Sequence, residues 1–573
     1  MRALIALPNT LTSATPMAPM LLSAATTSLA MPTRSQQHNL LAIATPAAAA
    51  AAAQALTAVP ALSLLPPLVT LAASVLLRHV ILAMLLGIWS GALLLKGAPL
   101  PALTATFDHY LVSAFLDYEH AGVLIFTAIL GGTIGLVQKS GGALGLASLV
   151  RRFFTTRRKG LLSTMALGSL VFFDDYSSIL IVGNALRPLL RAVNISKAKF
   201  ALVTHSMGVC LSSLSPVSSW VGLQIGYIAA AYSQLGSAWA TADPFVGFLQ
   251  TLPYRFFPLS MLALVAVVCS SDTDFGPMAE VEAAEAALPE QVATETDDAA
   301  DDSTIAGSLD PKPETPRRAI NALLPFGTVV GAAFFGMVAQ GADAIRAMPA
   351  AARPELTLMT ALRYSDSVTA LLWGSVFGWL LSLGLTLGQR LLSLDEAMAA
   401  WTEGIKDVLE PTIVLLLAWG LGSVIADVGT ASFLARSLQV GLPAWSLPAL
   451  ISLLGYAISF ACGSSFGTMG ILFPLVGPLA LALGGGSEPF VHHCFGATLG
   501  GAIFGNVCSP RSDTSILTTR ATRCSLSEHV RTILPYCALA GAVGLVAGDC
   551  LVGAGILSAA PAVGLCVASV FLG

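Results

Sequence analysis

The amino-acid sequence predicts an all-α protein that crosses a membrane many times and is built from two repeats. The composition is the first observation: 55% of the 573 residues are hydrophobic, only 10% are charged, and the mean hydropathy is +0.78. A soluble protein carries about 25% charged residues. The second observation is that polar phrases interrupt apolar segments in the same order in each half of the chain. The third is the uneven distribution of Lys and Arg, which orients the two halves.

Several nearly charge-free windows are long enough, or nearly so, to cross about 30 Å of hydrocarbon. They include Val80–Leu95, Ala121–Val137, Ala319–Ala339, Val368–Leu387 and Leu534–Val552. We therefore expect a multi-pass integral membrane protein with about 10–13 transmembrane segments.

The composition divides the chain into four parts. Residues 1–58 form a low-complexity leader, and no acidic residue precedes Asp108. This pattern is typical of an organelle targeting segment, so we expect an organelle membrane or otherwise the plasma membrane. Residues 59–270 and 319–573 form two transmembrane repeats. The acidic, proline-containing stretch 271–318 between them predicts a disordered connector.

Two polar phrases recur along the chain. Ser215–Ser219 reads SPVSS and Ser509–Asp513 reads SPRSD, and upstream of each lies another polar pair, at Ser177–Ser178 and Ser464–Ser465. Two interruptions per half in the same order are typical of a duplicated transporter with a central substrate site.

Basic residues flank the apolar segment 161–186 on both sides. Arg151, Arg152, Arg157, Arg158 and Lys159 precede it, and Arg187, Arg191, Lys197 and Lys199 follow it. Both ends should therefore face the cytoplasmic side, which requires a re-entrant hairpin with its tip near Asp174–Ser178. The matching segment 451–483 lacks basic flanks, and five expected crossings separate the two. These features predict an inverted-topology repeat with two re-entrant hairpins and two broken helices.

Asp174 and Asp175 lie within the apolar tip of the first hairpin. An acidic residue in a membrane span costs about 2.5–3.5 kcal/mol on insertion scales, so a buried pair favours a cavity, a cation or a proton. The alternative is that they cap a helix at the hairpin turn.

The serine- and proline-rich breaks supply hydroxyl oxygens and free carbonyls, which are ligands for Na⁺. Alternatively, these hydroxyls only join helices by hydrogen bonds. The candidate cation- or proton-binding residues are Asp174, Asp175, Ser177, Ser178, Ser215, Ser218, Ser219, Ser464, Ser465, Thr468, Ser509, Ser512, Asp513 and Thr514. We expect no cofactor and no metal beyond transported Na⁺, because paired-ligand motifs are absent. A net charge of −4 gives no basic surface for nucleic acid.

Two features favour other functions. Arg511 lies in the second break, where a guanidinium suits a carboxylate substrate, so a coupled carrier of an organic anion or amino acid is the alternative. Gly463–Gly467 matches G-x-S-x-G, which would make Ser465 the nucleophile of an intramembrane hydrolase with His205 or His493. That motif requires a β-sheet, which nothing in the sequence predicts. We therefore expect a carrier and not an enzyme.

Four segments together resemble the NhaC-type sodium/proton antiporters: Phe172–Ser177, Ser215–Gly222, Gly467–Leu472 and Gly505–Thr514. The resemblance extends from about Leu62 to Val552. It implies exchange of Na⁺ for H⁺ by alternating access, with hairpins and broken helices forming the site and a scaffold that forms a homodimer in the lipid bilayer. This chain departs from the family at His205 and Asn506, where the family usually has acidic residues.

Overall fold

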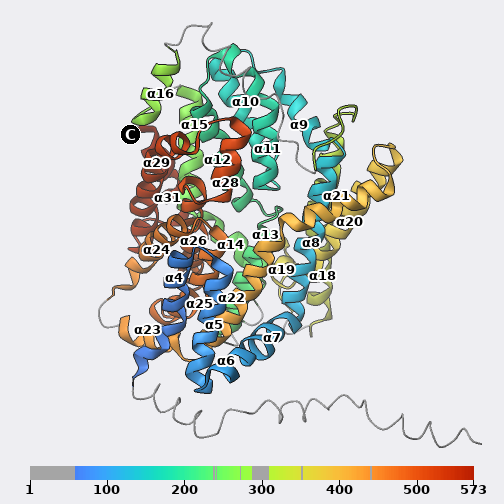
Figure 1. Cartoon of the computed structure of the whole chain (residues 1–573). Coiled ribbons are helices and arrows are strands. Elements are labelled where there is room, and N and C mark those ends of the chain that lie inside the picture. The colour runs from blue at the N-terminus through green and yellow to red at the C-terminus, as the bar shows by residue number, and fades with distance from the viewer. Residues whose placement is uncertain are drawn as a thin grey trace, which may run out of the picture.

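The computed structural model describes residues 59–236, 239, 242–271, 273–286, 309–349, 353–438 and 442–572, and this part of the chain is helical without any strand. The predictions for the leader and for residues 287–308 of the connector lie outside it. Segments from the two halves lie side by side (Figure 1): α11 (Asp175–Leu186) packs on α28 (Asp513–Thr522), and α5 (Val80–Lys96) packs on α22 (Leu409–Asp427).

Within the described ranges, eight helical segments are long and apolar enough to cross a membrane. They are Pro60–Leu77 (ending in α4, Leu65–Leu77), Tyr118–Lys139 (α8), Ile320–Ala347 (α18), Ser367–Gly388 (α20), Leu409–Asp427 (α22), Ala444–Cys462 (ending in α24, Leu447–Cys462), Ser465–Leu483 (α25) and Leu526–Gly553 (beginning with α29, Leu526–Val543). A ninth is the pair α14 (Pro244–Thr251) with its short extension to Tyr254 and α15 (Phe256–Ser271), bent by 53°. The chain is therefore a multi-pass integral membrane protein. The sequence analysis expects about 10–13 segments because it also counts shorter apolar helices, such as α5, as membrane-spanning.

The first predicted hairpin consists of two short helices. α10 (Arg157–Leu170) and α11 are joined by a non-helical turn, and Asp174 caps α11. At 1.5 Å per residue their 14 and 12 residues span about 21 and 18 Å, which is too short to cross 30 Å of hydrocarbon. This length fits a re-entrant hairpin, whose direction of entry stays a prediction.

The second predicted hairpin has longer arms, α24 and α25, each long enough to cross alone in the segments given above. They meet at Gly463, which has a φ of 73°. A Cβ at this position would lie 2.8 Å from the backbone carbon of Arg511, so both the conformation and the close approach require glycine. The turn of the second hairpin therefore packs directly on the second break.

Both predicted helix breaks are present. α12 (Lys197–Leu214) ends before Pro216 and α13 (Val221–Gln234) follows; α27 (Ile503–Cys508) ends before Pro510 and α28 follows. Proline has no N–H group to continue a helix, which explains why both helices stop there. The bend at Arg255 between α14 and α15 was not predicted.

The beginning of the connector is helical, although the sequence predicts disorder. α16 (Pro277–Ala286) and the residues before it form ion pairs with basic residues of three other helices. Asp274 pairs with Lys199 at 2.8 Å, Glu282 pairs with Arg157, and Glu280 pairs with Arg531. The acidic side chains thus neutralise basic helix ends, a tertiary interaction that local composition does not reveal. The division of the chain into two repeats stays a prediction.

The remaining α-helices and the two π-helical turns complete the described part of the chain. They are α6 (Pro99–Ala105), the π-helical turn η2 (Thr106–Leu111), α7 (Val112–Leu116), α9 (Gly142–Arg151), α19 (Leu358–Arg363), α21 (Leu394–Asp407), α23 (Thr430–Leu438), α26 (Glu488–Gly501), the π-helical turn η7 (Gly544–Cys550), α30 (Leu551–Gly553) and α31 (Ala559–Leu572). α21 packs closely along α8, where Gly131 and Gly135 meet Gly404.

Candidate functional site

The carboxylate of Asp174 joins the first hairpin tip to the first helix break. Its Oδ2 accepts hydrogen bonds from the Ser177 amide at 2.8 Å and from the Ser177 hydroxyl at 2.6 Å. Its Oδ1 accepts a hydrogen bond from the Ser219 hydroxyl at 2.7 Å. The Ser219 amide donates to the carbonyl of Phe173 at 2.8 Å. Asp174 therefore caps α11, as the alternative hypothesis expected, and also binds a hydroxyl predicted to belong to the site.

Asp175 is the first residue of α11 and is only 2% exposed. Its carboxylate interacts with the Trp220 side chain and with the negative charges of Asp174 and Asp513. The positive end of the α11 dipole favours a negative charge at this position. The helix dipole supplies only about half a positive charge, which is less than the charge of two ionised carboxylates. If both are ionised, the buried pair therefore keeps a net negative charge.

Buried hydroxyl groups lie beside these carboxylates between α11 and α12. A Cβ on Gly208 would lie 3.4 Å from the Asp175 carbonyl oxygen and 3.4 Å from Ser178 Cβ, so the two helices approach closely there. Ser212 lies one turn further along the same face of α12. The hydroxyls of Ser178 and Ser212 are buried and have no hydrogen-bond partner among the described residues. The sequence prediction included Ser178 but missed Ser212, whose signal was its i, i+4 spacing from a glycine.

The second break contacts the tip of the first hairpin through Asp513. The Tyr176 hydroxyl donates to Asp513 Oδ2, and the Thr514 amide donates to Asp513 Oδ1 at 2.8 Å. Ser512 donates to Asn506 Oδ1 at 2.7 Å, and Thr514 donates to the Asn506 carbonyl at 2.9 Å. Asp513 is exposed while Ser512 and Thr514 are buried. Asp513 therefore lies between the surface and the buried carboxylates.

The first break contacts the tip of the second hairpin in the reciprocal way. The Trp220 ring lies 4.6 Å from the Phe466 ring, and the Tyr227 hydroxyl donates to the Phe466 carbonyl at 3.0 Å. Each hairpin tip thus contacts the break of its own half and the break of the other half.

Several other predicted site residues hold the backbone of the turns and breaks. Four of the hydroxyls donate to backbone carbonyls: that of Ser215 to the carbonyl of Val217, that of Ser218 to the carbonyl of Ser212, that of Ser509 to the carbonyl of Phe460 and that of Thr468 to the carbonyl of Ser464. The hydroxyl of Ser464 accepts a hydrogen bond from the Gly467 amide. The structure therefore gathers Asp174, Asp175, Ser177, Ser178 and Ser219 in one place. The hydroxyls of Ser215, Ser218, Ser464, Thr468 and Ser509 instead bind the backbone of the turns and breaks.

Arg511 lies at the surface of the second break. Its Nη1 donates to the Ala461 carbonyl at 2.5 Å, at the second hairpin tip. Asp513 accepts from Tyr176 instead, and no ion pair between Arg511 and Asp513 is present within the described part of the chain.

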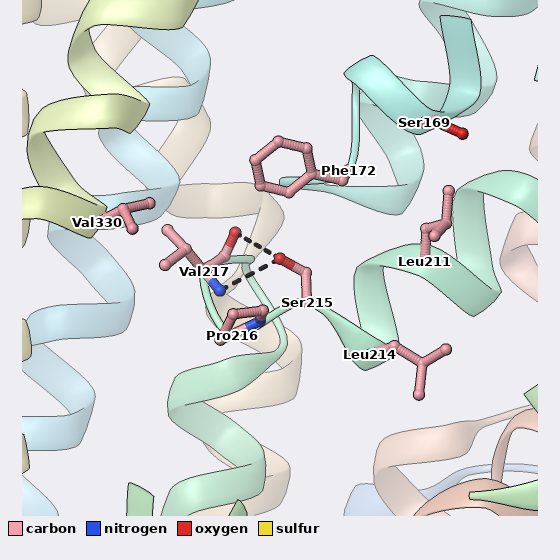
Figure 2. Close-up of a pocket in the computed structure, with 8 residues that line it drawn as sticks. All are labelled: Ser169, Phe172, Leu211, Leu214, Ser215, Pro216, Val217 and Val330. Atoms are coloured by element: carbon pink, nitrogen blue, oxygen red, sulfur yellow. Dashed lines mark hydrogen bonds between the residues drawn. The ribbon is translucent and has the colours of Figure 1, made fainter. Parts of the chain in front are cut away.

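A cavity of about 430 Å³ lies beside the first break (Figure 2), lined by Ser169, Phe172, Leu211, Leu214, Ser215, Pro216, Val217 and Val330. Its two hydroxyls are already engaged, because that of Ser169 donates to the Met165 carbonyl and that of Ser215 donates to the Val217 carbonyl. The dashed lines in Figure 2 mark the contacts of Ser215 with Val217. The cavity is therefore apolar. It does not suit a bare cation or a carboxylate, and it leaves space beside the unwound segment.

Two further polar residues near the site were not predicted. The Gln138 side chain of α8 donates to the Ser177 hydroxyl. Asp407 ends α21, and although the residue is exposed, partial desolvation by the surrounding protein and then the charges of Asp174 and Glu403 raise its pKa to about 6. Neither residue interrupts a repeated motif, so only the packing of α8 and α21 reveals them.

The arrangement of a serine hydrolase is not formed. In the part of the chain that the structure describes, the Ser465 hydroxyl is buried without a hydrogen-bond partner. His205 binds His529 and Thr514, and His493 lies 3.1 Å from Asp549. Ser465 therefore lacks the adjacent base that activates a nucleophile.

Comparison with known proteins identifies the family. The profile of the Na⁺/H⁺ antiporter family matches residues 214–548, more than half of the chain and both helix breaks. The chain belongs to this family. Members of this family are secondary transporters, so the chain is a secondary transporter. The family membership indicates a carrier rather than an enzyme.

Three relatives show how far the similarity extends. An uncharacterized protein of Haemophilus influenzae is 26% identical over 488 residues, which cover 83% of this antiporter-family chain and 88% of that protein. The arginine/ornithine antiporter ArcD of Halobacterium salinarum is 29% identical over 188 residues, 31% of this chain and 36% of that protein. The malate-2H⁺/Na⁺-lactate antiporter of Bacillus subtilis is 30% identical over 153 residues, 26% of this chain and 31% of that protein.

A solved structure supports the fold. The crystal structure of the YdaH transporter of Alcanivorax borkumensis, described as having an unusual topology, aligns with a TM-score of 0.52 and 15% sequence identity. The alignment covers 79% of this antiporter-family chain and 89% of that transporter. At this identity the likeness concerns the fold alone.

Proposed function

We propose that this protein exchanges Na⁺ for H⁺ across a membrane by alternating access, with both ions competing for the carboxylates of Asp174 and Asp175. The observation that carries the proposal is the burial of two adjacent carboxylates among hydroxyl groups. Asp175 is 2% exposed, and the side-chain charges that act on it in the described part of the chain are both negative. A buried charge is expensive unless it is compensated, so the pair favours a bound cation or proton.

Competition for one site is sufficient for exchange. When Na⁺ binds, the carboxylate releases its proton, and when a proton binds, the carboxylate loses its attraction for Na⁺. A conformational change that exposes the site alternately to the two sides then couples the two fluxes. Ser177, Ser178 and Ser219 are placed to add oxygen ligands, because they lie on the same hairpin tip and on the break that it contacts.

The reciprocal contacts of tips and breaks support the predicted inverted repeat, an arrangement with which many carriers achieve alternating access. Tyr176 of the first tip reaches Asp513 of the second break, and Phe466 of the second tip reaches Trp220 of the first break. Two related halves that face each other across one site produce such a pattern. The homodimer implied by the family resemblance stays a prediction.

The test uses purified protein in liposomes that contain a trapped pH dye. An imposed Na⁺ gradient should drive proton flux in the wild-type protein, with Li⁺ and K⁺ gradients as comparisons. The Asp175→Asn protein should lose this flux while inserting normally. Asp366→Asn is the matched control, because Asp366 caps α20 at an exposed position. Wild-type flux in the Asp175→Asn protein would contradict the assignment of the site.

A second candidate function is a Na⁺- or H⁺-coupled carrier of an organic anion or amino acid. The exposed guanidinium of Arg511 at the second break favours it, because such a group binds carboxylates bidentately. Two relatives carry names that include such substrates. This function predicts that labelled malate, lactate or arginine accumulates in the liposomes under an ion gradient and that Arg511→Gln abolishes the uptake.

A further inference from the structure

A buried pair of histidines connects α12 to α29 beside the second break. His205 Nδ1 lies 2.9 Å from His529 Nε2, and His205 Nε2 lies 3.0 Å from Thr514 Oγ1. Both histidines are 0% exposed. The proposed competition at Asp174 and Asp175 makes no use of these two rings, so their role needs a separate explanation.

The hydrogen-bond partners define where the protons lie. Thr514 donates its hydroxyl hydrogen to the Asn506 carbonyl, which only accepts. The hydroxyl therefore accepts a hydrogen from His205 Nε2. A neutral imidazole carries one N–H group, so His205 Nδ1 accepts from the Nε2–H group of His529. His529 Nδ1 then carries a free lone pair, and within the described ranges this buried nitrogen has no hydrogen-bond partner.

The opposite end of this chain of hydrogen bonds leads to a carboxylate. The Thr514 hydroxyl lies 2.7 Å from the Ser512 hydroxyl, and the latter lies 3.5 Å from Asp513 Oδ1. Asp513 in turn accepts a hydrogen bond from Tyr176, next to Asp175. His529 lies in the second turn of α29, close to exposed Ser525 at the start of that helix. The chain thus runs from near the surface at the start of α29 to the second break.

We infer that His529, His205 and Thr514 form a relay that carries protons between the surface at the start of α29 and the carboxylate of Asp513. This inference rests on the proposed exchange of Na⁺ for H⁺. A proton binds to His529 Nδ1, and the hydrogen on His529 Nε2 passes to His205 Nδ1. The Thr514 hydroxyl turns from the Asn506 carbonyl to Ser512, 2.7 Å away, and passes its hydrogen there as it receives the hydrogen on His205 Nε2.

For the last transfer the Ser512 hydroxyl turns from Asn506 Oδ1 to Asp513 Oδ1, which must approach from 3.5 Å, and gives its hydrogen to that oxygen. One proton enters at the imidazole and one arrives at the carboxylate, and no other group changes its charge. The reverse sequence returns the rings to their first tautomers and releases a proton at the α29 surface.

A purely structural role is the competing explanation, because the ring pair also holds α12 against α29. Glutamine separates the two explanations. Its amide reaches the position of an imidazole Nε2 and keeps a hydrogen bond there, but it does not take up and release protons near neutral pH. His529→Gln therefore retains the contact with His205 and interrupts the relay.

The experiment measures two transport modes of the full-length protein in liposomes. The first is proton flux driven by a Na⁺ gradient, and the second is exchange of radioactive Na⁺ for unlabelled Na⁺, which requires no proton. We expect His529→Gln to slow the first mode at least about tenfold, equivalent to about 1.4 kcal/mol of activation free energy, and to leave the second within about twofold. His492→Gln is the matched control, because His492 binds Tyr232 through Nε2 at 2.7 Å outside the relay.

Each outcome decides between the explanations. An equal loss of both modes in His529→Gln would assign the pair to structure, and wild-type rates in both modes would show that protons take another route; either result overturns the relay. If the wild-type protein performs neither mode, the proposed function itself fails, and the relay fails with it. That result is recognised without any variant.

Discussion

Replacing Asp174 by Asn and by Ala separates its structural role from its role in transport. Asn keeps an oxygen that caps α11 and an amide that still contacts Ser219, whereas Ala removes both contacts. Loss of an N-cap destabilises by about 1 kcal/mol, and a buried hydroxyl left without a partner costs about 1–3 kcal/mol. Ser177 retains the hydrogen bond from Gln138 in either variant. The Ala variant should therefore be about 2–4 kcal/mol less stable than the Asn variant.

Comparing the two variants with each other removes the effect of the charge, because both side chains are neutral. The free energy of unfolding is measured by denaturant titration in detergent micelles, and transport is measured as radioactive Na⁺ uptake into liposomes. We expect both variants to lose transport while only the Ala variant loses stability. If their stabilities agree within about 0.5 kcal/mol, the capping argument is wrong. If the Asn variant transports Na⁺ at the wild-type rate, the carboxylate is only a helix cap.

Two further predictions concern the ends of the helices. Asp274→Ala removes the carboxylate that pairs with the buried ammonium of Lys199 at 2.8 Å and should lower the free energy of unfolding by up to about 3–5 kcal/mol, and the double variant with Lys199→Met should recover part of this loss in the same titration. Asp407 has a pKa of about 6 in the folded protein, above its ordinary value of about 4, so the folded state binds the proton more tightly and loses stability as pH rises through this window. Asp407→Asn should therefore gain thermal stability over the wild-type protein at pH 7 and not at pH 4, and an equal gain at both pH values would contradict this assignment.

The sequence predicts the elements of the site because charge is rare in apolar segments. Asp174 and Asp175 stand out for this reason, and Pro216 and Pro510 mark both helix breaks. The sequence does not predict which hydroxyls face the carboxylates. Ser215 and Ser219 belong to one phrase, yet the first holds its own turn and only the second contacts Asp174.

Residues that reach the site through packing escape prediction for a physical reason. Asp407 lies on an amphipathic helix with ordinary polar neighbours, and only the close approach of Gly404 to α8 brings it near Asp174. α16 was expected to lack structure because acidic, alanine-rich segments do not bury enough apolar surface to fold alone. It is held instead by ion pairs with distant helices, and these partners are separated from it by more than a hundred residues in each direction.

The reciprocal contacts between tips and breaks have a consequence for the origin of this chain. A polypeptide with only one half would lack the contacts between halves. Tyr176 and Trp220 of the first half contact Asp513 and Phe466 of the second half. An ancestral protein with one repeat would therefore have formed the transport site only by pairing two copies inserted in opposite orientations. On the predicted inverted repeat, gene fusion would have fixed both orientations in one chain and freed the two copies to diverge, as the different residues at the matching caps, Asp174 and Ser464, illustrate. Two separately expressed halves should regain a functional carrier only when both are made in the same membrane.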